Sequence, residues 1–477
     1  MLRLFLIGML LVPIKSFTLP FNSNDAKALG MAGIGVASSG GFYAHQFNPA
    51  LLTLNPNRNR FYFSLNNASA QAIFQFDTYR ALLDLKNKNY GITLEQLIST
   101  MNTQLAAALT ADNSLDDSYN SNLQAFNSTS QAFIDRLTIV KKRFLSVDAS
   151  PVQVNFSFNI NQFGFSLFFT DQYFLHVLPT ASDCDLTLLK GYQDILTSIN
   201  TTDGILTEDK KNVQLRCQEE TELISVFDPT ATNNPLTNPF NTNLAKPLLY
   251  SKAIASYLHF QEIGFAVAHR LSLSNVLLSI GMTPKFTRVQ AAQMHSTIID
   301  ISQNRADFSD LYNQTKTQMF FNMDIASAID FNGDQSIVAG FIVKNIFNIA
   351  IAPAPTNDTE THYNFSLKPQ VRLGLKWQYK RFLFASDIDL SSNNGLYDKS
   401  FDESYATGET QHIGLGAEFH WSRFFHLRAG LKYNMLNRAD IGLSSGFSLL
   451  LNPLQFHLGL MYGYKSYGAG INLGIIF

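Results

Sequence analysis

Charge is what this chain of 477 residues has little of. Only 15% of its residues are charged, against about 25% in an ordinary soluble protein, and the formal net charge is −2. Proteins that bind nucleic acid carry a basic patch or an alkaline pI, which this composition does not provide. Hydrophobic residues make up 46% of the chain, and 40 residues are phenylalanine. We therefore expect a large core or a membrane-embedded wall, and no nucleic-acid partner.

Cysteine is almost absent, because Cys184 and Cys217 are the only two in the sequence. Two cysteines that do not form a C-x-x-C pair are too few for a structural zinc site. In an oxidising compartment they would close a loop as a disulfide, and the alternative is two free thiols. We favour the disulfide because of the export signal described next.

Long apolar runs are also missing. No segment after the N-terminus holds 18 consecutive apolar residues, so we predict no transmembrane helix. Arg3 and the short apolar run that follows it are typical of a signal peptide over residues 1–18, with cleavage after Ser16 or Thr18. A buried or anchoring helix is the alternative. No cysteine ends the run, so a lipoprotein is not expected.

Alternation of apolar and polar residues is what the chain has instead. Every second residue from Val152 to Ile160 is apolar, and from Phe163 onward the apolar positions switch parity. A two-residue turn at Asn161-Gln162 would place Ile160 opposite Phe163 and so keep both apolar rows on one face. The same switch occurs across Lys380-Arg381 and Asn452-Pro453. These segments are predicted to be hairpins with one apolar face.

Fourteen segments are predicted to be strands. They lie near residues 60–76, 152–161, 163–174, 253–268, 274–290, 317–330, 336–346, 366–379, 381–390, 410–421, 424–434, 440–450, 454–463 and 469–477. Most have the nine or more residues that a tilted strand needs to cross a bilayer. Short connections alternate with mostly long ones, notably 77–151, 175–252, 291–316 and 391–409. This pattern predicts an all-β membrane protein, an antiparallel transmembrane β-barrel, over a soluble β-sandwich.

The last strand carries a further signal. It places Ile471, Leu473, Ile475 and Phe477 on one face and ends the chain on an aromatic residue. Such strands resemble the assembly signal of outer-membrane barrels, and an ordinary amphipathic strand is the alternative.

A small-residue segment precedes the first strand. Gly33 and Gly35, with Ser38 in place of a third glycine, nearly match a dinucleotide loop, but no βαβ unit surrounds them. We expect no nucleotide there. We predict instead that residues 19–58 fold into the lumen as a plug, where glycines allow close packing.

The residues from Ala28 to Leu52, which include ALGMAGIGVA and NPALL, resemble the N-terminal signature of FadL-type outer-membrane barrels. They resemble more closely the related barrel family named TraF of plasmid transfer operons, which is distinct from the thioredoxin-like protein of the same name. The resemblance implies a fourteen-stranded barrel that passes long-chain fatty acids or other hydrophobic compounds, with an N-terminal hatch inside. No fatty-acid ligand motif carries over. The hatch residues would be Leu29, Gly30, Met31, Gly33, Gly35, Asn48, Pro49 and Ala50.

Two long connections interrupt the barrel, which we place at residues 59–477. In 77–151, the apolar residues recur at helical spacing, which predicts a helical insertion in an extracellular loop. Its apolar faces could form a capture groove at the barrel mouth, but packing against a neighbour is the favoured interpretation. The 175–252 connection is rich in Asn, Asp and Pro in its second half and is predicted to be a long surface loop.

Three remaining features are weak. Gly442 to Gly446 match G-x-S-x-G around Ser444, but within a strand rather than the strand–turn–helix of a nucleophile elbow. The histidines lack metal-ligand spacing, so no metal site is expected. Asp387 and Asp389 alternate with apolar residues and would face a wet interior, as lumen lining or simply solvated.

These observations favour a monomeric barrel in the outer membrane of a Gram-negative bacterium, inserted by the assembly machinery and taking up hydrophobic small molecules passively. We expect no enzyme activity, cofactor or catalytic residue. Two alternatives stay open: a structural or interaction barrel associated with conjugative transfer, and a surface enzyme such as a lipase that uses Ser444.

Overall fold

The structure is a computed structural model that describes most of the chain. Residues 1–24, which include the predicted signal peptide, lie outside the described part. The described ranges are 25–40, 43–54, 61–73, 76–111, 117–141, 145–201, 212–217, 220–225, 249, 251–273, 276–302, 310–331, 336–355, 365–392, 410–436, 441–463 and 466–476.

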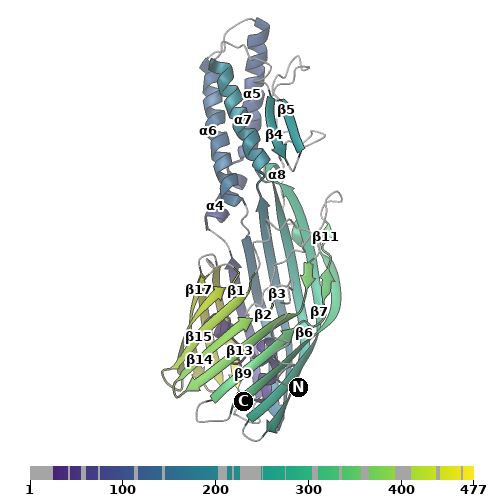
Figure 1. The fold of residues 1–477 in the computed structure, drawn as a ribbon, viewed down its shortest axis with the longest axis vertical. Helices are drawn as coiled ribbons and strands as arrows, with labels where there is room; N and C mark the ends of the chain where they lie inside the picture. Colours follow the sequence, from purple (N-terminus) through teal and green to yellow (C-terminus); the bar gives the residue numbers. More distant parts are fainter. Residues whose placement is uncertain are drawn as a thin grey trace.

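Within these ranges, fourteen strands close into one antiparallel barrel (Figure 1). Each strand pairs with the next in chain order, and the last pairs with the first. The strands are β1 (Phe61–Ile73), β2 (Leu145–Ile160), β3 (Phe163–Thr180), β6 (Lys252–Leu273), β7 (Val276–Thr297), β8 (Lys316–Phe331), β9 (Ser336–Lys344), β13 (Gln370–Tyr379), β14 (Phe382–Asp389), β15 (His412–His420), β16 (Phe425–Asn434), β17 (Ile441–Leu451), β18 (Leu454–Gly463) and β19 (Ser466–Ile476). The predicted barrel is confirmed, and each predicted segment overlaps one of these strands, several of which are longer than predicted.

The predicted registers are also confirmed. Ile160 pairs with Phe163 across the Asn161-Gln162 turn, and Tyr379 pairs with Phe382 across Lys380-Arg381. Leu451 pairs with Leu454 in the same way. The short turns therefore lie at one end of the barrel and the long connections at the other (Figure 1).

The barrel turns its apolar side chains outward, as a membrane barrel must. Leu415 and Leu473, for example, are 52% and 50% exposed, whereas the inward Asp387 and Asn472 are buried. Near the short turns, Trp377, Phe382 and Phe384 form outward aromatic stacks of the kind found at membrane interfaces. No helix in the described part of the chain is both long and apolar enough to cross a bilayer, a finding that does not bear on strands.

The strands β2, β3, β6 and β7 rise beyond the rest of the barrel toward the helices, and we call them the extended strands (Figure 1). β6 and β7 have 22 residues each, about twice the 9–11 that a tilted strand needs to span a membrane. The helices are α4 (Phe76–Asn87), α5 (Tyr90–Ala111), α6 (Asp117–Val140), α7 (Asp183–Thr201), α8 (Ile298–Ser302) and α9 (Asp310–Asn313). Three short pairings complete this end: β10 (Ile349–Ile351) with β12 (Phe365–Leu367), β11 (Ala354–Pro355) with β7, and β4 (Asn212–Cys217) with β5 (Glu220–Ser225).

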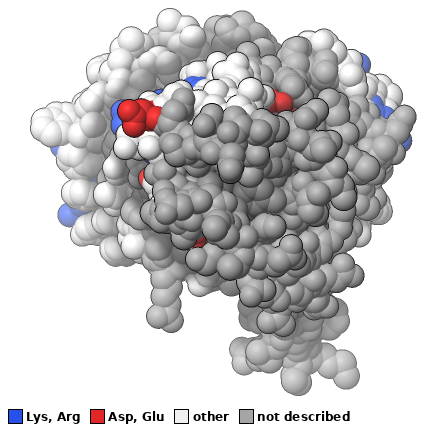
Figure 2. Space-filling model, turned by 90° about the horizontal axis from the view of Figure 1, so that it is seen from above, with Lys and Arg blue, Asp and Glu red and all other residues white. Residues whose placement is uncertain are grey.

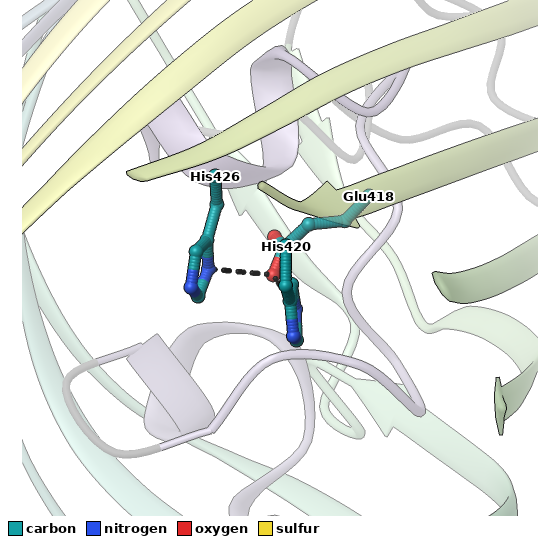
Figure 3. A group of neighbouring side chains, drawn as sticks. All are labelled: Glu418, His420 and His426. Atoms are coloured by element: carbon teal, nitrogen blue, oxygen red, sulfur yellow. Dashed lines mark hydrogen bonds and ion pairs between the residues drawn. The ribbon is translucent and has the colours of Figure 1, made fainter. Parts of the chain in front are cut away.

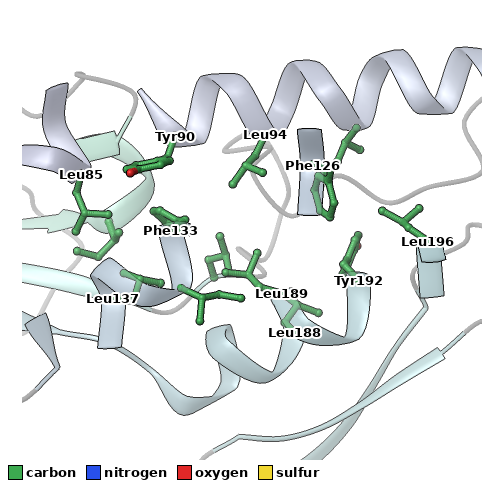
Figure 4. Close-up of a cluster of buried hydrophobic side chains, with 14 of the residues drawn as sticks. Leu85, Tyr90, Leu94, Phe126, Phe133, Leu137, Leu188, Leu189, Tyr192 and Leu196 are labelled. Carbon is green, nitrogen blue, oxygen red and sulfur yellow. The ribbon is translucent and has the colours of Figure 1, made fainter. Parts of the chain in front are cut away.

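The helices pack on one another rather than forming an open groove along their length. Leu94 of α5, Phe126 and Phe133 of α6 and Tyr192 of α7 are all buried in one cluster (Figure 4). The helical spacing of residues 77–151 thus reflects a bundle core, which is the favoured interpretation given above. α7 was not predicted, because the Asn- and Pro-rich composition further along its loop obscured the helical spacing of Leu188, Leu189 and Tyr192.

Candidate functional site in the barrel lumen

The N-terminal segment lies inside the barrel, which makes the lumen the place to look for function. It forms α2 (Ala26–Leu29), a series of turns, α3 (Ala44–Phe47) and the 3-10 helix η2 (Pro49–Thr53). α3 and η2 pack their buried Phe47, Leu51 and Leu52 against small or branched inward residues of β6, β8 and β9. Of the residues predicted for the hatch, Gly33 is half-buried and the other seven are buried: Leu29, Gly30, Met31, Gly35, Asn48, Pro49 and Ala50. We call described residues 25–54 the hatch segment.

The glycine turn binds an anionic oxygen, and that oxygen belongs to the barrel wall. The backbone N–H groups of Gly35 and Val36 donate to the same carboxylate oxygen of Asp387, at 2.8 and 3.0 Å. Ala32 and Gly33 just before them have positive φ, of 62° and 81°, which turns the chain toward β14. Asp387 thus sits where a phosphate would sit in a dinucleotide loop, which explains the near-match in the sequence.

Two further side chains fix the hatch segment. Ser444, the serine of the G-x-S-x-G match, lies on β17 and accepts a hydrogen bond from the Ala32 N–H at 2.7 Å. Asn48 donates to the carbonyls of Val36, at 2.8 Å, and Ser327, at 3.1 Å, and its own carbonyl oxygen accepts from Ala50 N–H. Ser444 is therefore a positioning residue in a strand, in a context unlike that of a nucleophile elbow.

At several positions, the wall that faces the hatch segment carries glycine. A Cβ added at Gly340 would lie 2.3 Å from the Val36 carbonyl oxygen, and one added at Gly459 would lie 2.1 Å from the Ala26 oxygen. Real Cβ atoms do not approach that closely, so these positions require glycine. The inward glycines of several neighbouring strands let the hatch backbone lie directly on the sheet.

Charged groups complete the contact between hatch and wall. Asp25 caps α2 through the N–H groups of Lys27 and Ala28 and accepts from the Asn472 amide at 2.5 Å. Burial raises the pKa of the Asp25 carboxyl above its usual value. On β13 and β14, Arg372 pairs with Asp389 at 2.5 Å and donates to the Gly33 carbonyl at 3.3 Å. Asp387 and Asp389 are thus lumen residues that bind specific partners.

A cavity of about 360 Å³ lies between the hatch segment and the wall near the short turns. Glu418 and His420 of β15 and His426 of β16 line it together with Lys27 of the hatch. The sequence analysis missed this cluster, because it looked for histidines at the spacing that brings metal ligands together on a helix. The usable signal is that His420 and His426 flank one hairpin turn, with Glu418 two residues earlier on the same strand face.

An apolar groove of about 370 Å³ lies outside the barrel, where α4, α8 and α9 meet the extended strands. Leu83 of α4, Leu175 of β3 and Tyr257 of β6 line it, and Tyr312 at its edge is 70% exposed.

Seen from above, the described atoms are mostly uncharged, and Lys and Arg side chains do not gather into one patch (Figure 2).

The other predicted site residues lie apart from the lumen. Cys184 is the second residue of α7 and is disulfide-bonded. The strand β4, which ends at Cys217, contacts α7. The Cys217 side chain lies outside the described set, so its part in the pairing stays a prediction. On β19, Ile471 and Leu473 face outward, Ile475 is half-buried, and Phe477 is outside the described ranges.

Several comparisons relate this chain to known proteins. The crystal structure of the Ralstonia pickettii toluene transporter TbuX matches with 10% identity, 95% of this chain, 97% of that chain and a TM-score of 0.42. The CymD monoaromatic hydrocarbon channel matches with 10% identity, 96% and 98% coverage and a TM-score of 0.42. The crystal structure of the P. putida toluene transporter TodX matches with 9% identity, covers 95% of this chain and 96% of that chain, and has a TM-score of 0.41.

A search of curated protein sequences finds no significant match. The sequence model of one family, described as "F plasmid transfer operon, TraF, protein", matches residues 46–389, from α3 in the hatch segment to the end of β14. That match covers well over half of the chain, and the protein therefore belongs to this TraF family.

Proposed function

We propose that the protein is an outer-membrane channel for the passive uptake of hydrophobic small molecules. It would be exported by a cleaved signal peptide, inserted as a monomer through its C-terminal strand, and work without enzymatic chemistry. The ligand would settle in the groove between α4 and the extended strands, pass over the rim, and enter the lumen as the hatch segment shifts. The groove is the observation that carries this proposal.

The extended strands support such a route because they carry apolar residues on both faces. Leu175 and Tyr257 face the outer groove, while the neighbouring Phe174 and Leu258 lie in an apolar cluster with β10 and β12. A molecule leaving the groove over the rim would therefore meet apolar surface on the inner side as well. A drug-sized ligand buries most of its surface in a pocket of roughly 300–1,000 Å³, a range that includes this groove.

Photolabelling of the protein in lipid nanodiscs tests the proposal. An uncharged aromatic diazirine should label α4 and the facing part of β3, and Leu83→Asp and Leu175→Asp should each reduce that labelling at least fivefold. Gln124→Asp, on an exposed face of α6, adds the same charge elsewhere and should leave labelling unchanged. Proteoliposomes with a lipopolysaccharide outer leaflet should admit an apolar fluorophore faster than empty ones, and equal rates would reject the channel.

A role as an interaction barrel in conjugative transfer is the second candidate. It is favoured by the family description and by the bundle of α5, α6 and α7, which stands clear of the barrel (Figure 1). A photo-crosslinking residue at Gln124 should capture a component of the transfer apparatus in cells that carry it. If capture occurs and no apolar probe binds the groove, the interaction role replaces the channel.

A further inference from the structure

Three potential metal ligands converge on the lumen wall near the short turns, at a place where the channel proposal assigns no role. Glu418 and His420 are two residues apart on β15 and therefore lie on the same face of the strand. His426 of β16 is the register partner of His420, so all three side chains project from one face (Figure 3). The His420 Nε2 lies 2.8 Å and the His426 Nδ1 3.2 Å from the same Glu418 oxygen, Oε1. One ligand atom from each residue lies within 4.8 Å of the other two.

These separations fit a tetrahedral transition-metal ion. Ligand atoms at about 2.0–2.1 Å from such an ion lie about 3.3 Å apart. The His426–Glu418 separation is close to this distance, the His420–Glu418 separation would widen, and the two histidine nitrogens, which lie within 4.8 Å of each other, would move to it. Two imidazoles and one carboxylate are the donor set of open zinc sites, in which the fourth position takes water or substrate. All three residues line the cavity of about 360 Å³, which has room for that water.

The second oxygen of Glu418 is already held in place. Arg428 Nε donates to Oε2 at 2.5 Å, and Lys27 of the hatch segment lies 4.0 Å from the same atom. These partners orient the carboxylate so that Oε1 faces the histidines, as outer-shell groups do in metal sites. The two cations also oppose a bound dication, which predicts an affinity that rises when one of them is removed.

We propose that Glu418, His420 and His426 form a binding site for a divalent transition-metal ion of the zinc class, on the lumen wall beside the hatch segment. An ion bound there would draw Glu418 toward the histidines and weaken its attraction to Lys27. The site would therefore link metal occupancy to the contact between the hatch segment and the wall. It does not depend on the outer groove or on its ligand.

Zinc titration of the full chain, purified without a histidine tag and reconstituted in nanodiscs, tests the site by calorimetry. We expect one Zn²⁺ per barrel and a Co²⁺ adduct with the absorption bands of a tetrahedral ion. His420→Asn and His426→Asn should each weaken Zn²⁺ binding at least about tenfold. His457→Asn is the matched control, because His457 lines the same cavity but bonds to Ser448, and it should change the affinity less than twofold.

Lys27→Met separates a metal site from a site for an anion such as phosphate. The substitution should tighten Zn²⁺ binding by about two- to fivefold, whereas it would weaken an anion site. If the histidine variants do not fold, Zn²⁺ protection of His420 and His426 from diethyl pyrocarbonate gives the same answer in the unaltered protein. Absence of stoichiometric Zn²⁺, affinity unchanged in both variants, or no protection would each overturn the proposal.

Discussion

A single methyl group on the wall should loosen the hatch segment. Gly430 of β16 faces the lumen, and a Cβ added there would lie 2.6 Å from the Ser444 hydroxyl and 2.7 Å from both Ala32 N and Met31 C. Forcing a methyl group into such a contact costs about 1–3 kcal/mol. The Ala32–Ser444 hydrogen bond would also be strained, at about 1 kcal/mol. Gly430→Ala should therefore weaken hatch docking by about 2–4 kcal/mol.

Hydrogen exchange followed by mass spectrometry measures this directly on peptides from residues 26–40. A loss of about 2–4 kcal/mol corresponds to roughly 30- to 1,000-fold faster exchange when opening limits the rate. Ser444→Ala removes only the hydrogen bond, and it should make exchange in these peptides roughly fivefold faster. Gly442→Ala is the matched control, since its nearest neighbouring atom would be 3.7 Å away. Unchanged exchange in a folded Gly430→Ala barrel would refute the argument that the hatch backbone rests on the wall glycines.

Two other predictions concern the barrel exterior and the helical bundle. Leu415→Lys places a charge on the lipid face and should destabilise the barrel by about 2–4 kcal/mol in urea unfolding in lipid vesicles, whereas the lumen-lining Gln378→Lys should cost less than about 1 kcal/mol; equal effects would contradict the assigned faces. Cys184→Ser should lower the stability of the bundle by about 3 kcal/mol and expose α7 to protease, and reducing agent should do the same to the unaltered protein. If mass spectrometry of the unaltered protein finds no peptide that links Cys184 to Cys217, the predicted pairing is wrong.

The barrel could be predicted from the sequence because its two faces meet different solvents. A strand between lipid and a lumen must alternate, and a hairpin of two-residue turns must switch parity, so Asn161-Gln162 and Lys380-Arg381 fix their registers locally. The outer end of β7, residues 291–297, was not predicted, whereas the outer end of β6 was. Side chains on both faces of β7 are buried there, so the alternation that marks a lipid-facing strand no longer applies.

The hatch segment could be located from its motif, but its partners could not. Asp387 lies 352 residues from Gly35 in the chain, and only closure of the barrel brings them together. Ser444 matches a sequence motif for catalysis, yet its hydroxyl accepts a hydrogen bond from the Ala32 N–H. His420 and His426 are brought together by a register pairing between β15 and β16, which spacing rules for helices do not consider.

The contacts of the hatch segment divide it into two parts with different reasons to stay in place. α3 and η2 bury Phe47, Leu51 and Leu52, and moving them would expose apolar surface to a polar lumen. The part before them buries Met31 and Ile34 in a small apolar cluster and is also tied to the wall by polar contacts. Five hydrogen bonds join it to Asn472, Ser444, Asp387 and Arg372, and water in the lumen can replace each of them at a cost of about 1 kcal/mol. A ligand that binds a rearranged state of this part would therefore select it more readily than a state in which α3 and η2 also move. We therefore expect residues 25–40 to move during passage while α3 and η2 stay on the wall.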